Sequence, residues 1–270
     1  MNVRVFFVSD RTGITAETLG ETLLTQFPKF EFQKTTLPFV DSPERAHEAA
    51  NTIKEAERQG AAVLVFSTLT DETSQKIIAE GTKNVFDLFG TFIGPLEQTL
   101  NAHSSHTVGQ MHGIRDVGAY EQRIQALNYT LDHDDGMRVR GLDRADIILV
   151  GVSRCGKTPT CLYLALQYHL RAANYPLTDD DLDTGTLPEV LQPWRKKLHG
   201  LTIQPERLSL IRQERRPHGR YATLQQCRSE VSRAEALYRE ENLPFLDTSS
   251  ISIEEIAATL VQRHDLHKPF

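Results

Sequence analysis

Apolar stretches of strand length alternate along this chain with longer stretches of helical periodicity. The strand-like runs cover residues 3–8, 32–40, 61–67, 145–150 and 245–246. Helices are expected to begin near residue 14 and at 41–44, and to cover 71–80, 84–100, 120–131, 157–169, 205–216, 221–241 and 252–263. Such alternation is typical of βαβ units, in which a helix connects two parallel strands. The pattern therefore predicts an α/β fold with largely parallel sheets.

The apolar run at 145–150 leads directly into the sequence GVSRCGKT at residues 151–158. Its spacing, Gly-x-x-x-x-Gly-Lys-Thr, is that of a phosphate-binding loop (P-loop), whose backbone amides point at phosphate groups. The lysine would neutralise the terminal phosphate, and the threonine hydroxyl would hold a magnesium ion. The expected nucleotide-binding residues are Gly151, Val152, Ser153, Arg154, Cys155, Gly156, Lys157 and Thr158, with Thr158 as the metal ligand.

A P-loop is shared by kinases, GTPases and motor ATPases, and it suits ADP and ATP equally. The Asn-Lys-x-Asp element of GTPases is absent from the sequence, and so are the H-R-D-x-x-x-x-N and D-F-G motifs of eukaryotic protein kinases. No apolar strand ends clearly in the aspartate that usually assists the metal. Asp247, after the short run 245–246, is interpreted as the cap of a turn.

Composition narrows the class of protein. The net charge of −6 disfavours a nonspecific nucleic-acid binder, because phosphate backbones attract positive charge. The three cysteines form no Cys-x-x-Cys pair, which favours reduced thiols. The apolar run at the N-terminus is shorter than a signal-peptide core, and no run reaches membrane-spanning length. We therefore expect a soluble, cytoplasmic protein with neither nucleic acid nor membrane as a partner.

Two domains are expected from the length and from a polar, turn-rich stretch between Asp135 and Asp143. The first, at residues 1–140, would be a Rossmann-like α/β domain, with dimerisation or target binding as its candidate roles. The second, at residues 141–270, would be a P-loop kinase-like α/β domain that binds the nucleotide.

Three blocks of the sequence resemble a known family. They are VSDRTGITAE at 8–17, LDHDDG at 131–136 and GVSRCGKTPTCLYLALQYHLRAANYPL at 151–177. Together they resemble the phosphoenolpyruvate synthase regulatory proteins, the bacterial relatives of the plant regulators of pyruvate, phosphate dikinase. The resemblance covers essentially the whole chain, and the form of the glycine-rich loop is similar to that of the synthase branch.

The resemblance implies a bifunctional enzyme. One reaction would transfer phosphate from ADP to a threonine of phosphoenolpyruvate synthase and inactivate that enzyme. The other would remove the phosphate with inorganic phosphate as the acceptor, releasing pyrophosphate and restoring activity. The implied ligands are ADP, Mg²⁺ and inorganic phosphate, the implied protein partner is the synthase, and a homodimer is a candidate assembly.

Phosphoryl transfer to a hydroxyl requires charge neutralisation and a group that accepts the proton. Lys157 is the first catalytic candidate, and Asp134 and Asp135 are the preferred proton acceptors because they lie in a family-like block. Competing carboxylates are Asp10 and the cluster Asp179, Asp180, Asp181 and Asp183. Each of these acids is equally well explained as a turn or helix cap.

Other polar segments have two interpretations each. Arg215, Arg216 and Arg220 would form either a basic lid over the nucleotide or a solvated loop. The histidines at 103, 106 and 112 are interpreted as loop residues, with docking of the target as the alternative. The sequence SDRTG at 9–13 is interpreted as a helix cap, with anion binding or a subunit interface as alternatives.

Two other functions fit the same motifs. A small-molecule P-loop kinase would carry a similar loop, helix and arginine lid. A nucleotide-sensing module would bind through the loop without turnover. Phosphorylation of the synthase distinguishes the first alternative, and regulation that survives substitution of Lys157 distinguishes the second.

Overall fold

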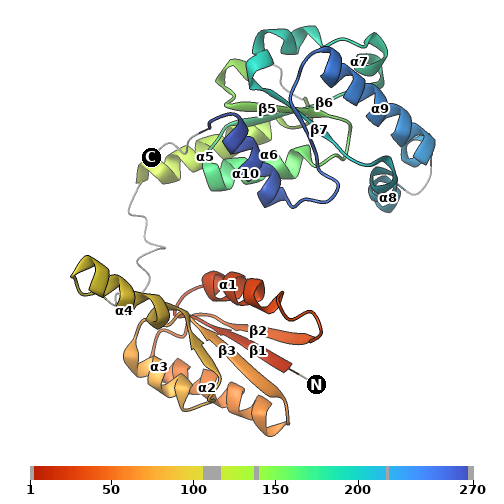
Figure 1. Cartoon of the computed structure of the whole chain (residues 1–270). Helices are drawn as coiled ribbons and strands as arrows, with labels where there is room; N and C mark the ends of the chain where they lie inside the picture. The colour runs from red at the N-terminus through yellow and green to blue at the C-terminus, as the bar shows by residue number, and fades with distance from the viewer. Residues whose placement is uncertain (1–2, 106–116, 137–139, 217–218, 267–270) are drawn as a thin grey trace. The chain divides into compact units, whose positions relative to one another are not determined.

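The computed structural model of the 270-residue chain describes residues 3–105, 117–136, 140–216 and 219–266. The chain divides into two units, Met1–Gly113 and Ile114–Phe270, and each unit has its own four-stranded parallel sheet (Figure 1). The predicted α/β class is therefore confirmed. None of the described helices combines the length and apolar character needed to cross a membrane.

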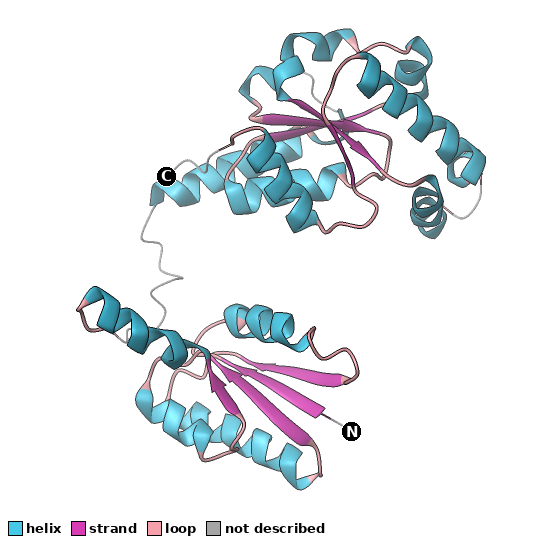
Figure 2. Cartoon of the chain, viewed as in Figure 1, coloured by secondary structure: helices cyan, strands magenta, loops and turns pink. Residues whose placement is uncertain are grey.

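The first unit has its strands in the order β2-β1-β3-β4. The strands are β1 (Val3–Val8), β2 (Phe32–Leu37), β3 (Ala62–Ser67) and β4 (Val85–Asp87), and the helices are α1 (Ile14–Leu24), α2 (Pro43–Arg58), α3 (Glu72–Ala79) and α4 (Leu88–Leu100). Side chains alternate between the faces of β1, as a strand requires. Phe7 packs with Ala16 of α1, whereas Phe6 packs with Ile53 of α2. Helix α1 thus covers one face, and α2 and α3 cover the other (Figure 2).

The second unit has the strand order β6-β5-β7-β8. Its strands are β5 (Ile147–Gly151), β6 (Ala172–Pro176), β7 (Leu198–Thr202) and β8 (Phe245–Asp247). Its α-helices are α5 (Val117–Asp132), α6 (Lys157–Tyr168), α7 (Asp179–Thr184), α8 (Pro205–Arg215), α9 (Leu224–Glu240) and α10 (Ile253–Arg263). Its described residues also contain the 3₁₀ segments η2 (Asp134–Gly136), η3 (Leu142–Arg144), η4 (Glu189–Lys197) and η5 (Arg220–Ala222).

Both faces of the second sheet are covered. Helices α5, α6 and α10 lie on one side, and α7 and α9 lie on the other (Figure 1). The side chains of Ile147, Ile148, Leu149 and Val150 in β5 are consequently inaccessible to solvent. This explains why β5 is a continuous apolar run without alternation, as is usual for a parallel strand buried on both sides.

The division between the units falls before α5, rather than at the expected boundary of 140 and 141. Helix α5 and the turn after it pack onto β6. The Thr130 hydroxyl accepts a hydrogen bond from the backbone N–H of Ala172 at 3.2 Å, and the His133 carbonyl accepts one from the backbone N–H of Asn174 at 3.0 Å. Residues 117–136 therefore belong to the second unit, because their polar groups complete the edge of its sheet.

Three strands were not expected from the sequence: β4, β6 and β7. The first was included in an expected helix at 84–100, whereas α4 begins only at Leu88. Asp87 ends β4 and caps α4, accepting hydrogen bonds from the amides of Phe89 and Gly90.

Candidate functional site

Residues 151–158, here called the glycine loop, connect β5 to α6. The loop leaves the carboxyl end of β5, which lies between β6 and β7 in the sheet. After β5 the chain forms β6 on one side of it and then β7 on the other side, so the strand order reverses at β5. Ligands of open parallel sheets bind at such a point, outside the carboxyl ends of the strands.

Two glycines fit the loop into this space. A Cβ atom on Gly151 would lie 2.6 Å from the Leu201 carbonyl oxygen and 2.8 Å from the Cys155 sulfur, so a larger residue would displace β7 or the loop. Gly156 precedes α6 with φ 96°, a left-handed conformation that favours glycine. Beneath the loop, the Tyr238 hydroxyl of α9 donates to the carbonyls of Val150 and Leu201 at 3.2 and 3.3 Å.

Side chains hold the carbonyl oxygens of the glycine loop. The Lys157 ammonium donates to the carbonyls of Gly151 and Val152 at 2.8 and 2.9 Å, and this side chain is only 4% exposed. The Arg212 guanidinium donates to the Ser153 carbonyl at 3.1 Å. The Thr248 hydroxyl donates to the Cys155 carbonyl at 3.0 Å.

The amides of the loop have no comparable partners. Among the described residues, none accepts a hydrogen bond from the backbone N–H of Ser153, Arg154 or Gly156, while the Cys155 N–H interacts with its own thiol. Helix α6 begins immediately afterwards, so its positive end adds to the same region. Free amides, a helix N-terminus and the Lys157 ammonium together form a cradle suited to an oxyanion such as phosphate.

A polar cluster of three side chains lies at the first turn of α6. The Thr158 hydroxyl donates to Asp134 Oδ1 at 2.9 Å, and the Asn174 amide donates to the same Oδ1 at 2.5 Å and to the Thr158 oxygen at 2.9 Å. Asp134 comes from η2, Thr158 from α6 and Asn174 from β6. Segments from three parts of the chain therefore converge beside the glycine loop.

The oxygen atoms of this cluster are of the kind that bind a magnesium ion. Asn174 is 3% exposed, and its Oδ1 is a buried oxygen without a hydrogen-bond partner among the described residues. Thr158 and Asp134 add a hydroxyl and a carboxylate. Magnesium prefers oxygen ligands and is commonly held by one or two protein groups together with substrate phosphates.

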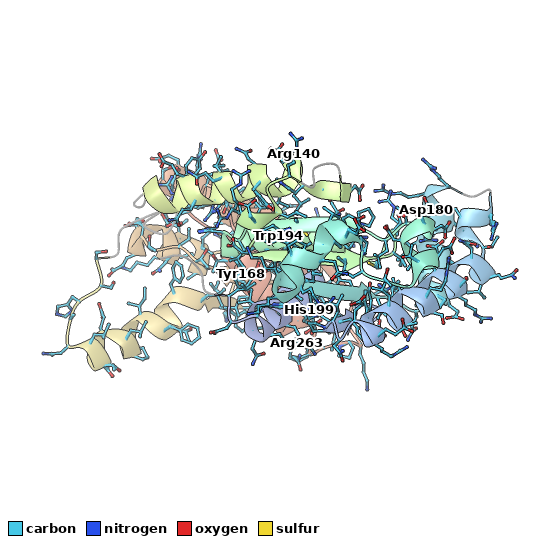
Figure 3. The ribbon with its side chains drawn as sticks, turned by 90° about the horizontal axis from the view of Figure 1, so that it is seen from above. Arg140, Tyr168, Asp180, Trp194, His199 and Arg263 are labelled. Atoms are coloured by element: carbon cyan, nitrogen blue, oxygen red, sulfur yellow. The ribbon has the colours of Figure 1, made fainter. Side chains whose placement is uncertain are left out.

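Asp135, the second preferred carboxylate, is not part of this cluster. It is exposed and has a left-handed backbone with φ 50°. The competing acids of the second unit serve structural purposes. Asp181 completes the capping box of α7, and Asp179 and Asp183 form ion pairs with Arg233. Asp180 is exposed on α7 (Figure 3).

The remaining acidic candidates are also explained locally. Asp10, in the first unit, accepts a hydrogen bond from the Thr70 hydroxyl at 2.9 Å. Asp247 accepts one from the Ser249 amide at 2.8 Å, which agrees with its interpretation as a turn cap. In the SDRTG segment, Ser9 accepts from the Arg11 amide at 3.2 Å, and Gly13 precedes α1 with φ 83° and without a side-chain cap.

The arginines of the expected lid differ in their surroundings. Arg215 and Arg216 are exposed at the end of α8, whereas Arg220 donates to the Gln226 side chain at 3.1 Å. Pro217 and His218, between them, lie outside the described residues. Among the expected histidines, His106 and His112 also lie outside, and the His103 side chain is fully exposed. Within the described ranges, no group of three His, Cys, Asp or Glu side chains could hold a metal ion.

Burial makes the cysteine in the loop chemically inert. Cys155 is 1% exposed, and burial is the main cause that raises the pKa of its thiol. A thiol that stays protonated is a poor nucleophile. Cys155 therefore contributes backbone groups to the loop rather than redox chemistry.

Several residues near the loop were not expected from the sequence: Asn174, Arg212, Tyr221 and Glu230. In β6, the buried residues are Ala172, Ala173 and Asn174, of which Asn174 alone is polar. This signal was missed because the strand itself was not recognised from the sequence. Arg212 lies in an expected helix rich in charged residues, where nothing in the pattern indicates that one arginine points inward.

Comparisons with known proteins agree along nearly the whole chain. A family model described as kinase/pyrophosphorylase matches residues 5–261. A Marinobacter nauticus protein is 50% identical over 262 residues, covering 97% of each chain. A Legionella pneumophila (strain Corby) protein is 52% identical over 258 residues, covering 95% of each chain. A Pseudomonas putida (strain GB-1) protein is 48% identical over 271 residues, covering all of each chain. All three relatives bear the provisional name phosphoenolpyruvate synthase regulatory protein.

Proposed function

The chain belongs to the kinase/pyrophosphorylase family, and from this premise we propose that it is a bifunctional regulator of phosphoenolpyruvate synthase. It phosphorylates a threonine of that enzyme with ADP as the donor, which inactivates the synthase. It reverses the modification with inorganic phosphate as the acceptor, which releases pyrophosphate. The names of the relatives support the target, and the glycine loop supports phosphoryl transfer.

One observation carries the proposal: the amides of Ser153, Arg154 and Gly156 have no hydrogen-bond partner in the described part of the chain, while the neighbouring carbonyls are held by side chains. In the proposed complex these amides bind the diphosphate of ADP. The Lys157 ammonium exchanges at least one loop carbonyl for a phosphate oxygen and neutralises charge that develops there during transfer. This positioning and charge stabilisation supply most of the catalysis in phosphoryl transfer.

Asp134 is the proposed proton acceptor. Its Oδ1 receives the hydrogen bonds of Thr158 and Asn174, while no described residue donates to its Oδ2. The target hydroxyl attacks the β-phosphorus of ADP, the bond between that phosphorus and the bridging oxygen breaks, AMP leaves, and the threonine proton passes to Asp134. In the second reaction, inorganic phosphate attacks the phosphorus of the threonyl phosphate, the bond between that phosphorus and the threonine oxygen breaks, and pyrophosphate forms. The proton of the attacking phosphate passes through Asp134 to the threonine oxygen.

Thr158, Asp134 and Asn174 would hold a magnesium ion beside the phosphates. When bound, the ion would offset the negative charge of the diphosphate. The lid arginines remain a proposal: Arg215 and Arg216 are exposed and free to reach an anion, and Arg220 would first release Gln226.

Incubation with ADP, magnesium and purified phosphoenolpyruvate synthase tests the forward reaction, with threonine phosphorylation followed by mass spectrometry. Added inorganic phosphate should then release pyrophosphate and restore the synthase. We expect Lys157→Ala to abolish both reactions, whereas Lys196→Ala, at an exposed lysine, should not affect either. Transfer to a small metabolite with an unmodified synthase would refute the proposal and support a small-molecule kinase.

A second pair of variants tests the proton acceptor. Asp134→Asn should lower kcat by about 100-fold or more while ADP still binds, because a general base contributes that much to proton transfer. Asp135→Asn is the matched control at the adjacent, exposed position. If Asp135→Asn shows the larger loss, the assignment of Asp134 is wrong.

A further inference from the structure

Arg212 of α8 is an arginine whose side chain has no solvent exposure. It forms a forked ion pair with Glu230 of α9: Nη1 lies 3.1 Å from Oε1, and Nη2 lies 2.6 Å from Oε2. Burying two charges is costly, and a buried ion pair often stabilises a fold no better than an apolar pair of similar size. The position of this pair therefore calls for a reason other than stability.

Two further hydrogen bonds connect Arg212 to the glycine loop and to Tyr221. Nη2 donates to the Ser153 carbonyl at 3.1 Å, and Nη1 donates to the Tyr221 carbonyl at 3.0 Å. The guanidinium carbon lies 4.1 Å from the centre of the Tyr221 ring, whose hydroxyl is 2.9 Å from the Ser153 hydroxyl. Arg212 and Tyr221 thus hold both the backbone and the side chain of Ser153.

The contact with Ser153 fixes the direction of the next amide. A peptide group is planar and trans, so its carbonyl and its N–H point in opposite directions. Because the Ser153 carbonyl is drawn toward Arg212, the Arg154 N–H must point away from Arg212. Arg154 has φ 74°, a left-handed conformation that is unfavourable for arginine and persists only where the surroundings enforce it.

We propose that Arg212, oriented by Glu230, is a positioning residue that keeps the Arg154 amide turned into the phosphate cradle. It does not touch the reacting atoms. Lys157 also holds loop carbonyls, but its ammonium is required by the phosphate when ligand binds. Arg212 remains paired with Glu230, so the loop stays ordered in both states. The inference rests on the proposed binding of a nucleoside diphosphate by the glycine loop.

The double variant Arg212→Met/Glu230→Met separates this role from a purely structural one. Replacing both charges with flexible apolar side chains avoids an unpaired buried charge, so the protein should fold with a thermal midpoint close to that of the wild type. We expect the Kd for ADP, measured by calorimetry with magnesium, to rise about tenfold, because a charged hydrogen bond that orders the cradle is lost. The KM for the synthase should not change.

The matched control is Arg228→Met/Glu206→Met, which removes an exposed ion pair between the same two helices, with a separation of 2.7 Å. It should leave the affinity for ADP unchanged. If the Arg212 and Glu230 double variant fails to fold, Arg212→Lys replaces it, since lysine keeps a positive charge beside Glu230 but lacks the fork. It should weaken ADP binding in the same direction.

The outcomes distinguish failure of the positioning role of Arg212 from failure of the proposed function. A folded variant of Arg212 that binds ADP as tightly as the wild type overturns the positioning role and leaves the proposed function intact. A wild-type protein that binds no ADP overturns the proposed function, and this inference with it. Weaker ADP binding with unchanged KM for the synthase supports both.

Discussion

Acid should destabilise the second unit through His199, which lies in β7 and has no solvent exposure. Its Nδ1 is 2.9 Å from His264 Nε2. Burial, and to a lesser extent the nearby His264 and Arg263, lower the pKa of His199 from 6.5 to about 3. Burial also lowers the pKa of His264. The folded protein therefore resists protonation at a pH where the unfolded chain accepts it.

The direction of the effect follows from proton binding. Above pH 6.5, His199 is neutral in both states and costs nothing. As the pH falls from 6.5 toward 3, the unfolded state binds a proton that the folded state does not, so stability is lost. One pH unit corresponds to about 1.36 kcal/mol, so lowering the pH to about 4.5 should cost about 2 to 3 kcal/mol from this residue.

Urea unfolding followed by tryptophan fluorescence measures this loss. The chain has a single tryptophan, Trp194, which lies in η4 just before β7 and therefore reports on the second unit. The unfolding free energy should be compared at about pH 7.5 and about pH 4.5 for the wild type and for His199→Leu. The variant should lose about 2 to 3 kcal/mol less than the wild type, since contributions from carboxylates cancel in the comparison. An equal loss in both proteins would refute the reasoning.

Two further predictions concern the loop and the thiols. Gly151→Ala should lower the unfolding free energy by about 1 to 3 kcal/mol in the same fluorescence assay, because the new Cβ would lie 2.6 Å from the Leu201 carbonyl oxygen; an unchanged midpoint would show that β7 yields freely. A thiol reagent at neutral pH should label no cysteine of the native protein and all three after denaturation, as counted by mass spectrometry, because burial raises the thiol pKa values and blocks access; rapid native labelling would contradict this. The cysteines are Cys155, Cys161 and Cys227.

The sequence indicated β3 and β5, whose apolar runs are continuous, but it missed β6 and β7, which contain poor strand formers, and it included the short β4 in an expected helix. In β6, Asn174 and Pro176 hide the pattern, yet the Asn174 amide is needed by Thr158 and Asp134. In β7, Gly200 interrupts the run, because a Cβ there would lie 2.9 Å from atoms of the Tyr238 ring. Tertiary contacts determine which residues occupy these positions, and the periodicity of a sequence does not reveal such contacts.

The glycine loop could be predicted because its pattern lies within eight consecutive residues, with an apolar strand pattern directly before it and a helical pattern directly after it. The ranking of Asp134 came from its sequence block, and the structure brings it to Thr158. Arg212 and Ser153 are 59 positions apart and meet only through the packing of α8 and α9. No pattern within one segment could indicate that pairing.

The Tyr238 hydroxyl, shared between the carbonyls of Val150 and Leu201, anchors the base of the cradle from a helix far along the chain. Because this anchor is already formed, the loop should lose little conformational entropy if it binds an anion. An anion should therefore bind with little rearrangement of the loop, so that most of the free energy of the contacts contributes to affinity.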